Sequence, residues 1–155
     1  MKKIKVMALS DLHLGEPEGL LYNKPPNILD ILVAKVSELA NGGGGIEDGI
    51  EELILIGDIA DLSEAKPEEA YSNTKVFLTA ILKKVSVDKV IYIPGNHDHH
   101  LWVEMLEAHY GKCYKECTPK TRVSIQKPNA LMERCIPADY KGDVEAYYPF
   151  YKIKM

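Results

Sequence analysis

Cysteine is scarce in this sequence, with three residues among 155. An odd number without a repeating framework does not predict a disulfide-stapled extracellular domain, and it is typical of proteins from a reducing compartment. Cys113 and Cys117 are close enough in sequence to clip a metal, but no second pair of cysteine or histidine residues follows at zinc-finger spacing. Free thiols are therefore the expectation, and the cytoplasm is the expected location.

Long hydrophobic runs and an excess of positive charge are also missing. No segment approaches the roughly 18–20 apolar residues of a membrane-spanning helix. The segment 1–11 begins with lysines, but it has no long apolar run and no small-residue cleavage site, so no secretory leader is expected. The net charge of −4 gives no basic surface for the phosphate backbone, so nucleic acid stays open as a partner without being indicated by charge.

Short apolar runs and helical patterns alternate along the first two-thirds of the chain. Such an order predicts an α/β fold with a parallel-rich sheet and crossover helices. Because the apolar runs are nearly continuous, we expect the strands to be buried on both faces. The expected strands are Lys3–Leu9, Glu52–Ile56 and Lys89–Ile93; the expected helices are Ile28–Ala40, Pro67–Val85 and a third with Leu101, Trp102, Met105, Leu106 and His109 on its apolar side.

Residues 111–155 differ in character from this βαβαβα region over 1–110. Prolines divide them into short pieces, of which Thr121–Gln126 is the clearest strand. Residues 147–155 alternate apolar and basic side chains towards their end, which predicts a further strand there. We expect residues 1–155 to form a single domain.

Each of the three expected strands is followed at once by residues that can bind metals. The strings are Asp11-Leu12-His13, then 57–61 (Gly-Asp-Ile-Ala-Asp), then 95–98 (Gly-Asn-His-Asp). Each separation is long enough for one crossover helix, so all three strings can emerge at the same edge of a parallel sheet. Ligand sites of open α/β sheets lie outside the carboxyl ends of the strands. The sequence therefore predicts a site at this edge.

The residue types at these strand ends indicate a metal centre. Carboxylate and amide oxygens mixed with imidazole suit manganese, iron or zinc better than a pure calcium site. Asp11 and His13 are two residues apart, so in an extended chain both side chains reach the same ion. A carboxylate such as Asp58 can bridge two ions, and two metals about 3.5–4 Å apart can clamp the oxygens of a phosphoryl displacement.

In their residues and their order, the strings Asp11-x-His13, Gly57-Asp58-x-x-Asp61 and 95–98 resemble the first three signatures of the calcineurin-like metallophosphoesterases. The resemblance implies the first half of an α/β/β/α sandwich. It also implies a metal-dependent hydrolase of phosphomonoesters or phosphodiesters. The expected cofactors are two divalent ions, with manganese favoured and iron, zinc or magnesium as alternatives.

The resemblance also implies a role for each residue. Asp11 and His13 would bind the first metal, Asp58 would bridge both metals, and Asn96 would bind the second. Asp61 would lie behind the metal ligands and orient His13.

Two further residues would be catalytic by the same resemblance. His97 would face the substrate as a general acid or as a stabiliser of phosphoryl charge, and Asp98 would hold the His97 ring. The nucleophile would be a metal-bound hydroxide.

The sequence departs from the family after residue 111. The family normally adds a lone histidine and then a Gly-His-x-His signature, but the last histidine of these 155 residues is His109. The second metal is then left with Asp58 and Asn96 alone. We therefore expect an incomplete, truncated domain. The alternatives are a catalytically deficient fragment that binds one metal weakly or serves as a partner-binding module, and completion by a homodimer or another chain.

Simpler readings exist for several of these residues. Asp11, Asp58 and Asn96 are types that often occur in turns and helix caps. His99 and His100 lie at the expected start of the third helix, where exposure to solvent is a better expectation than replacement of the missing ligands. His109 falls on the apolar side of that helix and is expected in the core.

Overall fold

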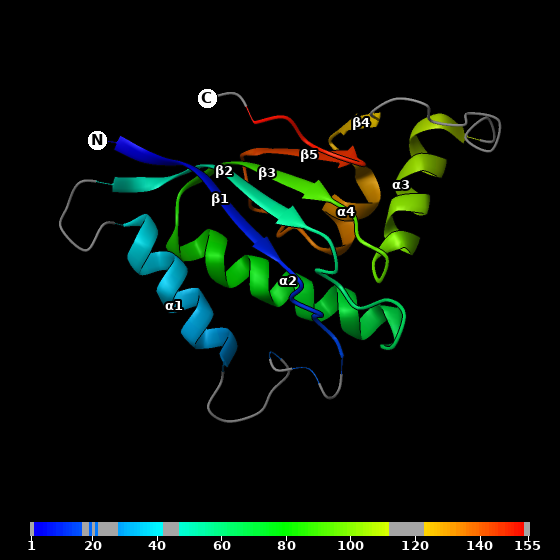
Figure 1. The fold of residues 1–155 in the computed structure, drawn as a ribbon, viewed down its shortest axis with the longest axis horizontal. Coiled ribbons are helices and arrows are strands. Elements are labelled where there is room, and N and C mark those ends of the chain that lie inside the picture. The colour runs from blue at the N-terminus through cyan, green and yellow to red at the C-terminus, as the bar shows by residue number, and fades with distance from the viewer. Residues whose placement is uncertain are drawn as a thin grey trace.

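A five-stranded mixed sheet forms the centre of the fold in the computed structural model (Figure 1). The structure describes residues 2–16, 19, 21, 28–41, 47–111 and 123–153. Their elements, in chain order, are β1 (Lys2–Ser10), α1 (Ile28–Ala40), β2 (Glu47–Ile56), α2 (Pro67–Lys84), β3 (Val87–Ile93), α3 (His99–Tyr110), β4 (Val123–Gln126), α4 (Asn129–Arg134) and β5 (Asp143–Tyr148).

The sheet has the strand order β1-β2-β3-β5-β4. The first four of these strands run parallel, and β4 pairs with β5 in the antiparallel sense at the edge. In the register of the first three strands, Ser10 pairs with Ile56, and Ile56 pairs with Ile93. The carboxyl ends of β1, β2 and β3 are therefore level, and the loops that follow them begin side by side.

The four described helices contribute to one apolar core on the same face of the sheet (Figure 1). From α2, Phe77 and Ile81 are completely buried, in the same core as Leu53 of β2 and Val90 of β3. Fully burying one such side chain contributes about 1.5–3 kcal/mol. This packing holds α2 along the central strands and so fixes the sheet edge that carries the site.

The opposite face of the central strands is covered as well. Ile54 of β2 and Ile91 of β3 are buried there in a smaller cluster with Tyr147 of β5. The chain after β5 returns over the sheet (Figure 1), where the hydroxyl of Tyr151 donates a hydrogen bond to Oε1 of Glu52 at 2.8 Å. The expected burial of both faces is therefore found in the central strands.

The predicted fold class is confirmed, since the chain is an α/β protein with a mostly parallel sheet and crossover helices. The helix Ile28–Ala40 has the predicted bounds, and the strand expected at Thr121–Gln126 is described from Val123. The single domain over 1–155 and the incomplete sandwich stay predictions.

The strand expected over residues 147–155 is wrong in its extent. The last strand among the described residues is β5, which ends at Tyr148, because Pro149 has no N–H to donate and cannot continue a sheet ladder. The expectation for His109 is also wrong, because this residue is exposed and its ring lies against Tyr110 with centroids 4.6 Å apart.

Among the described residues, no helix combines the length and the apolar character that crossing a membrane requires. Cys135, which follows α4, is a free and buried thiol. Cys113 and Cys117 lie outside the described residues, so the expectation of free thiols at these two positions stays a prediction.

Candidate metal centre

The loops after β1 and β2 run side by side and bring their polar residues together. The backbone N–H of Asp11 donates to the carbonyl of Gly57 at 3.2 Å, and that of His13 donates to the carbonyl of Asp58 at 2.9 Å. These hydrogen bonds continue the parallel pairing of β1 and β2 beyond the strands. Because this pairing holds the two loops in register, it fixes the positions of their polar residues relative to one another.

Asp11, His13 and Asp58 have left-handed backbone conformations, with φ angles of 53°, 46° and 51°. Such angles are uncommon for residues other than glycine and cost of order 1–3 kcal/mol each where they are strained. In the described part of the chain, only Lys127 shares this property among the non-glycine residues. Strained conformations concentrate at functional sites, where the surrounding structure holds them in place.

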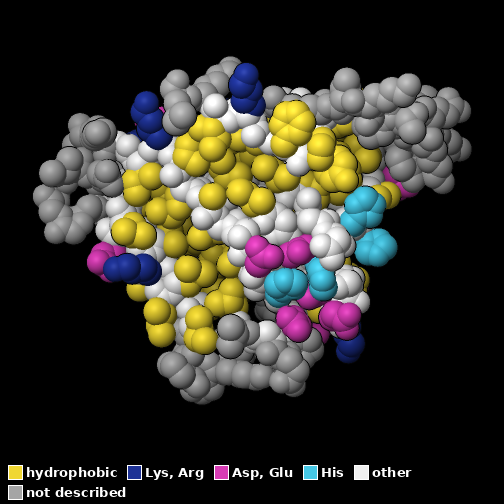
Figure 2. All heavy atoms as spheres, viewed as in Figure 1, with side chains coloured by type: hydrophobic (Ala, Val, Ile, Leu, Met, Phe, Trp, Pro, Cys, Tyr) yellow, Lys and Arg dark blue, Asp and Glu magenta, His cyan; other side chains and the backbone are white. Residues whose placement is uncertain are grey.

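The same three residues form a cluster of ligand atoms. One oxygen of Asp11, one ring nitrogen of His13 and one oxygen of Asp58 all lie within 4.8 Å of one another. Figure 2 shows histidine and acidic side chains gathered at this place on the surface. Two carboxylates and one imidazole in reach of a single point are a suitable donor set for a divalent cation.

Gly95 allows the loop after β3 to approach this cluster. A Cβ atom on Gly95 would lie 2.6 Å from the backbone nitrogen of Asp58 and would also collide with its carboxylate. The backbone N–H of His97, two residues further on, donates to Oδ1 of Asp58 at 2.9 Å. A glycine is therefore required here for the third loop to hold the Asp58 side chain in place.

Asp61 lies behind the cluster and joins two histidines. Its Oδ2 atom is 3.1 Å from Nδ1 of His13 and 3.2 Å from Nδ1 of His97. Its Oδ1 atom accepts hydrogen bonds from the backbone N–H groups of Ser63 at 3.1 Å and Glu64 at 2.9 Å. Burial raises the pKa of Asp61, but the hydrogen bonds from Glu64, His13, His97 and Ser63 outweigh it and hold this pKa well below its usual range. The side chain is therefore an anion.

An anionic Asp61 determines which nitrogen each histidine presents. A carboxylate only accepts hydrogen bonds, so each Nδ1 atom carries the proton, and the Nε2 atoms are left for other partners. For His13 the free atom could bind a metal ion, and for His97 it is a group that could face a substrate. The hydrogen bond to Asp61 raises the pKa of His97 against a smaller opposing effect of burial.

Asp98 does not occupy the position expected from the sequence. Its carboxylate is completely buried and accepts hydrogen bonds from the backbone of Ile59 at 3.1 Å and Gly95 at 2.5 Å. Burial raises its pKa more than these hydrogen bonds lower it. Among the described contacts, the His97 ring meets Asp61 and Ser63 instead, the latter at 2.6 Å. Asp98 therefore links the second and third loops from inside the fold.

Asn96, His99 and His100 are all exposed to solvent. Asn96 is exposed in the turn between Gly95 and His97. His99 and His100 are exposed at the start of α3, as expected. Neither of them belongs to the two groups of possible ligands among the described residues, which are Asp11 with His13 and Asp58, and His13 with Asp61 and His97.

Sequence reasoning did not foresee that Asp61 contacts both histidines or that Ser63 takes part. The spacing Asp61-x-Ser63 is a usable signal, because an aspartate often accepts hydrogen bonds from the backbone two and three residues later. That signal predicts the turn. It does not predict which side chains contact the Oδ2 atom of Asp61, because those side chains belong to the loops after other strands.

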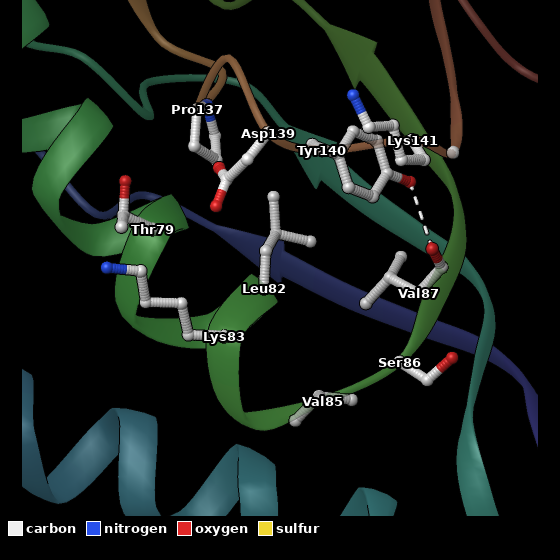
Figure 3. Close-up of a pocket in the computed structure, with 11 residues that line it drawn as sticks. Thr79, Leu82, Lys83, Val85, Ser86, Val87, Pro137, Asp139, Tyr140 and Lys141 are labelled. Carbon is white, nitrogen blue, oxygen red and sulfur yellow. Dashed lines mark hydrogen bonds between the residues drawn. The ribbon is translucent and has the colours of Figure 1, made fainter.

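A hollow of about 230 Å³ lies at the other end of the sheet, between the carboxyl end of α2 and the start of β3 (Figure 3). Lys83, Asp139 and Tyr140 are among its lining residues, and the Tyr140 hydroxyl donates to the carbonyl of Val87 at 3.1 Å. Because Val87 begins β3, this hollow is separated from the metal-ligand cluster by the length of the strand.

The comparison with protein families identifies the chain. The model of the family described as calcineurin-like phosphoesterase matches residues 4–149, a range that includes all three loops and β5. The chain therefore belongs to the calcineurin-like phosphoesterase family, a family of metal-dependent phosphoesterases. No curated protein and no solved structure matches it.

Proposed function

We propose that this chain hydrolyses phosphomonoesters or phosphodiesters with the help of two divalent metal ions. The observation that carries the proposal is the cluster of Asp11, His13 and Asp58 beside the Asp61–His97 pair. Membership of the phosphoesterase family supports the same reaction. The acidic side chains of this cluster would repel a phosphate group, so binding it there needs cations between them.

Asp11 and His13 would hold the first ion, Asp58 would lie between both ions, and Asn96 would reach the second. Manganese suits this mixture of oxygen and nitrogen donors, with iron, zinc and magnesium as alternatives. When bound, such ions neutralise the phosphoryl oxygens and make a water molecule nucleophilic near neutral pH. The structure favours this use of the three loops because Gly95 leaves room for the Asp58 carboxylate.

His97 would donate a proton to the leaving oxygen. Its Nδ1 atom is held by Asp61, so the proton available to a substrate is on Nε2. The anion stabilises the protonated ring, and the raised pKa of His97 keeps more of it protonated near neutral pH. In this proposal Asp61 positions His97, and Asp98 holds the loops that carry Asp58 and His97.

The test is turnover of a small phosphomonoester and a small phosphodiester with Mn²⁺ by the wild-type chain and two variants. We expect Asp58→Asn and His97→Ala to lose activity while the circular dichroism spectrum and thermal midpoint stay close to wild type. The matched control is His109→Ala, since His109 is exposed and lies on α3 away from the ligand groups. Unchanged turnover in both site variants would contradict the proposal that phosphoesters are hydrolysed at this site.

A second candidate is a chain that binds one metal weakly or is completed by another copy. The observation in its favour is that no histidine follows His109 within these 155 residues, which offer only Asp58 and Asn96 as proposed ligands of the second ion. Calorimetric titration with Mn²⁺ separates the two candidates, since two tight sites favour the hydrolase and one weak site favours the incomplete centre. Measurement of the solution mass, with and without Mn²⁺, tests completion by a second copy.

A further inference from the structure

A hollow of about 500 Å³ adjoins the candidate metal centre. Asp11 and His13, two of the proposed ligands, form part of its wall. The rest of the wall comes from the loop after β1 and from the first turns of α1. We call this hollow the α1 groove, and its lining residues are Asp11, Leu12, His13, Glu16, Gly19, Leu21, Ile28 and Leu32.

The apolar part of the α1 groove is aliphatic and begins at the ligands themselves. Leu12 stands between Asp11 and His13 in the chain, and Ile28 and Leu32 lie one helical turn apart on the same side of α1. These side chains are only partly buried, so they still offer surface to a ligand. Figure 2 shows that hydrophobic side chains adjoin the histidine and acidic cluster on this face.

Among the described lining residues of the α1 groove, Asp11 and Glu16 carry carboxylates, and this described part of the lining holds no lysine or arginine. A nucleotide or any other substrate with a second phosphate group would meet the Glu16 carboxylate there, and no lysine or arginine among the described lining residues. An uncharged aliphatic group would instead remove apolar surface from water, which is favourable in proportion to the area buried.

From these observations we propose that the substrate is a phosphoester of an alkyl group, which lies in the α1 groove while the phosphate lies at the metal centre. This inference rests on the proposed function, since it names the substrate class of the same site. Burying one methylene group strengthens binding by about fourfold. Affinity is therefore expected to rise with the length of the alkyl chain until the groove is filled.

The first test measures binding without turnover. Methyl-, butyl- and octylphosphonate are titrated by calorimetry into the chain with Mn²⁺, each below its aggregation concentration. We expect the dissociation constant to fall by about fourfold for each methylene group that enters the groove. Equal constants for the three compounds would overturn the proposal, and so would adenosine monophosphate binding more tightly than octylphosphonate.

Variants of α1 locate the effect. Leu32→Gln and Ile28→Gln should each weaken octylphosphonate binding by about tenfold and leave methylphosphonate unchanged. Ile31→Gln is the matched control, because Ile31 is on the same helix, is 57% exposed and does not line the groove. A loss of affinity for both phosphonates with Leu32→Gln and Ile31→Gln alike would place the effect on folding of the helix and would contradict the groove.

The second test measures turnover of methyl and octyl phosphate. Hydrolysis of both at equal kcat/KM would leave the proposed function intact and overturn the alkyl preference. Binding that depends on chain length without hydrolysis of either would support the α1 groove and contradict the proposed function. The two proposals can therefore fail separately.

Discussion

Asp61 lies 3.2 Å from Nδ1 of His97, although the two residues belong to the loops of different strands. The same oxygen is 3.1 Å from Nδ1 of His13. One buried carboxylate thus sets the ring orientation of a proposed metal ligand and of a proposed proton donor.

Replacing Asp61 should weaken metal binding, although Asp61 is not a proposed ligand of either ion. In Asp61→Ala the His13 ring loses the acceptor that fixes its protonated nitrogen. Such losses typically cost about 10–100-fold in affinity. Calorimetric titration with Mn²⁺ measures the effect, and Asp139→Ala is the control, because Asp139 is exposed and lies by the hollow at the other end of the sheet. Equal affinity in Asp61→Ala and wild type would show that His13 needs no orienting group.

The contribution of Asp61 to the free energy of unfolding should decrease both at low pH and at high pH. The pKa of Asp61 is lowered by folding, so its contribution is present above the ordinary value of 3.8 and declines below it. The pKa of His97 is raised by folding, so its contribution is present below the ordinary value of 6.5 and is lost as pH rises through the raised value. The difference in unfolding free energy between wild type and Asp61→Asn should therefore be largest between pH 4 and 6.

Urea unfolding in the presence of a chelator measures this difference from pH 3 to pH 8. The chelator is needed because a bound cation would change the charges around both groups. A difference that stays constant over the whole range would mean that the Asp61–His97 pair is not ionised in the way that its hydrogen bonds indicate.

Gly95→Ala should weaken metal binding, although the substitution adds only one methyl group. The added Cβ atom would collide with Asp58, so the third loop would have to move away from the second. We expect weaker Mn²⁺ binding together with a lower thermal midpoint. Gly111→Ala is the control: Gly111 has a positive φ angle of 62° but open space around its Cβ position. It should lose about 1–3 kcal/mol of stability with unchanged metal affinity.

Cys135 should be inert towards thiol reagents in the folded protein. Burial raises the pKa of its thiol to about 12, so very little reactive thiolate forms at neutral pH. Ellman's reagent should react with the Cys113→Ser, Cys117→Ser double variant only after urea is added, because Cys135 is then the remaining cysteine. Rapid reaction under native conditions would show that the region after α4 opens readily.

Sequence patterns predicted the parts of the fold that depend on local periodicity. The helix Ile28–Ala40 and the strand ends next to Asp11, Asp58 and Gly95 could be predicted from the sequence. Apolar residues recur at helical spacing in the helix, and polar residues follow each apolar run at the strand ends. The helix α4 and the strand β5 were not predicted. Each has only six residues, and β5 depends on pairing with β3 and β4, which are distant in the chain.

The site shows the same division. The three loops were predicted to meet at one sheet edge because parallel strands place their carboxyl ends together. The contact of Asp61 with His97 in place of Asp98 could not be predicted, because it depends on which way each side chain turns. Asp98 turns inward to Ile59 and Gly95, and Asp61 is left to contact His97.

The level ends of β1, β2 and β3 also bear on how cations influence the folding equilibrium. Ser10, Ile56 and Ile93 are aligned only when all three strands are paired, so an unfolded chain has its proposed ligands scattered. A cation that binds there recognises the native form and not the denatured one. Added Mn²⁺ should therefore raise the melting temperature in proportion to the logarithm of its concentration above the dissociation constant.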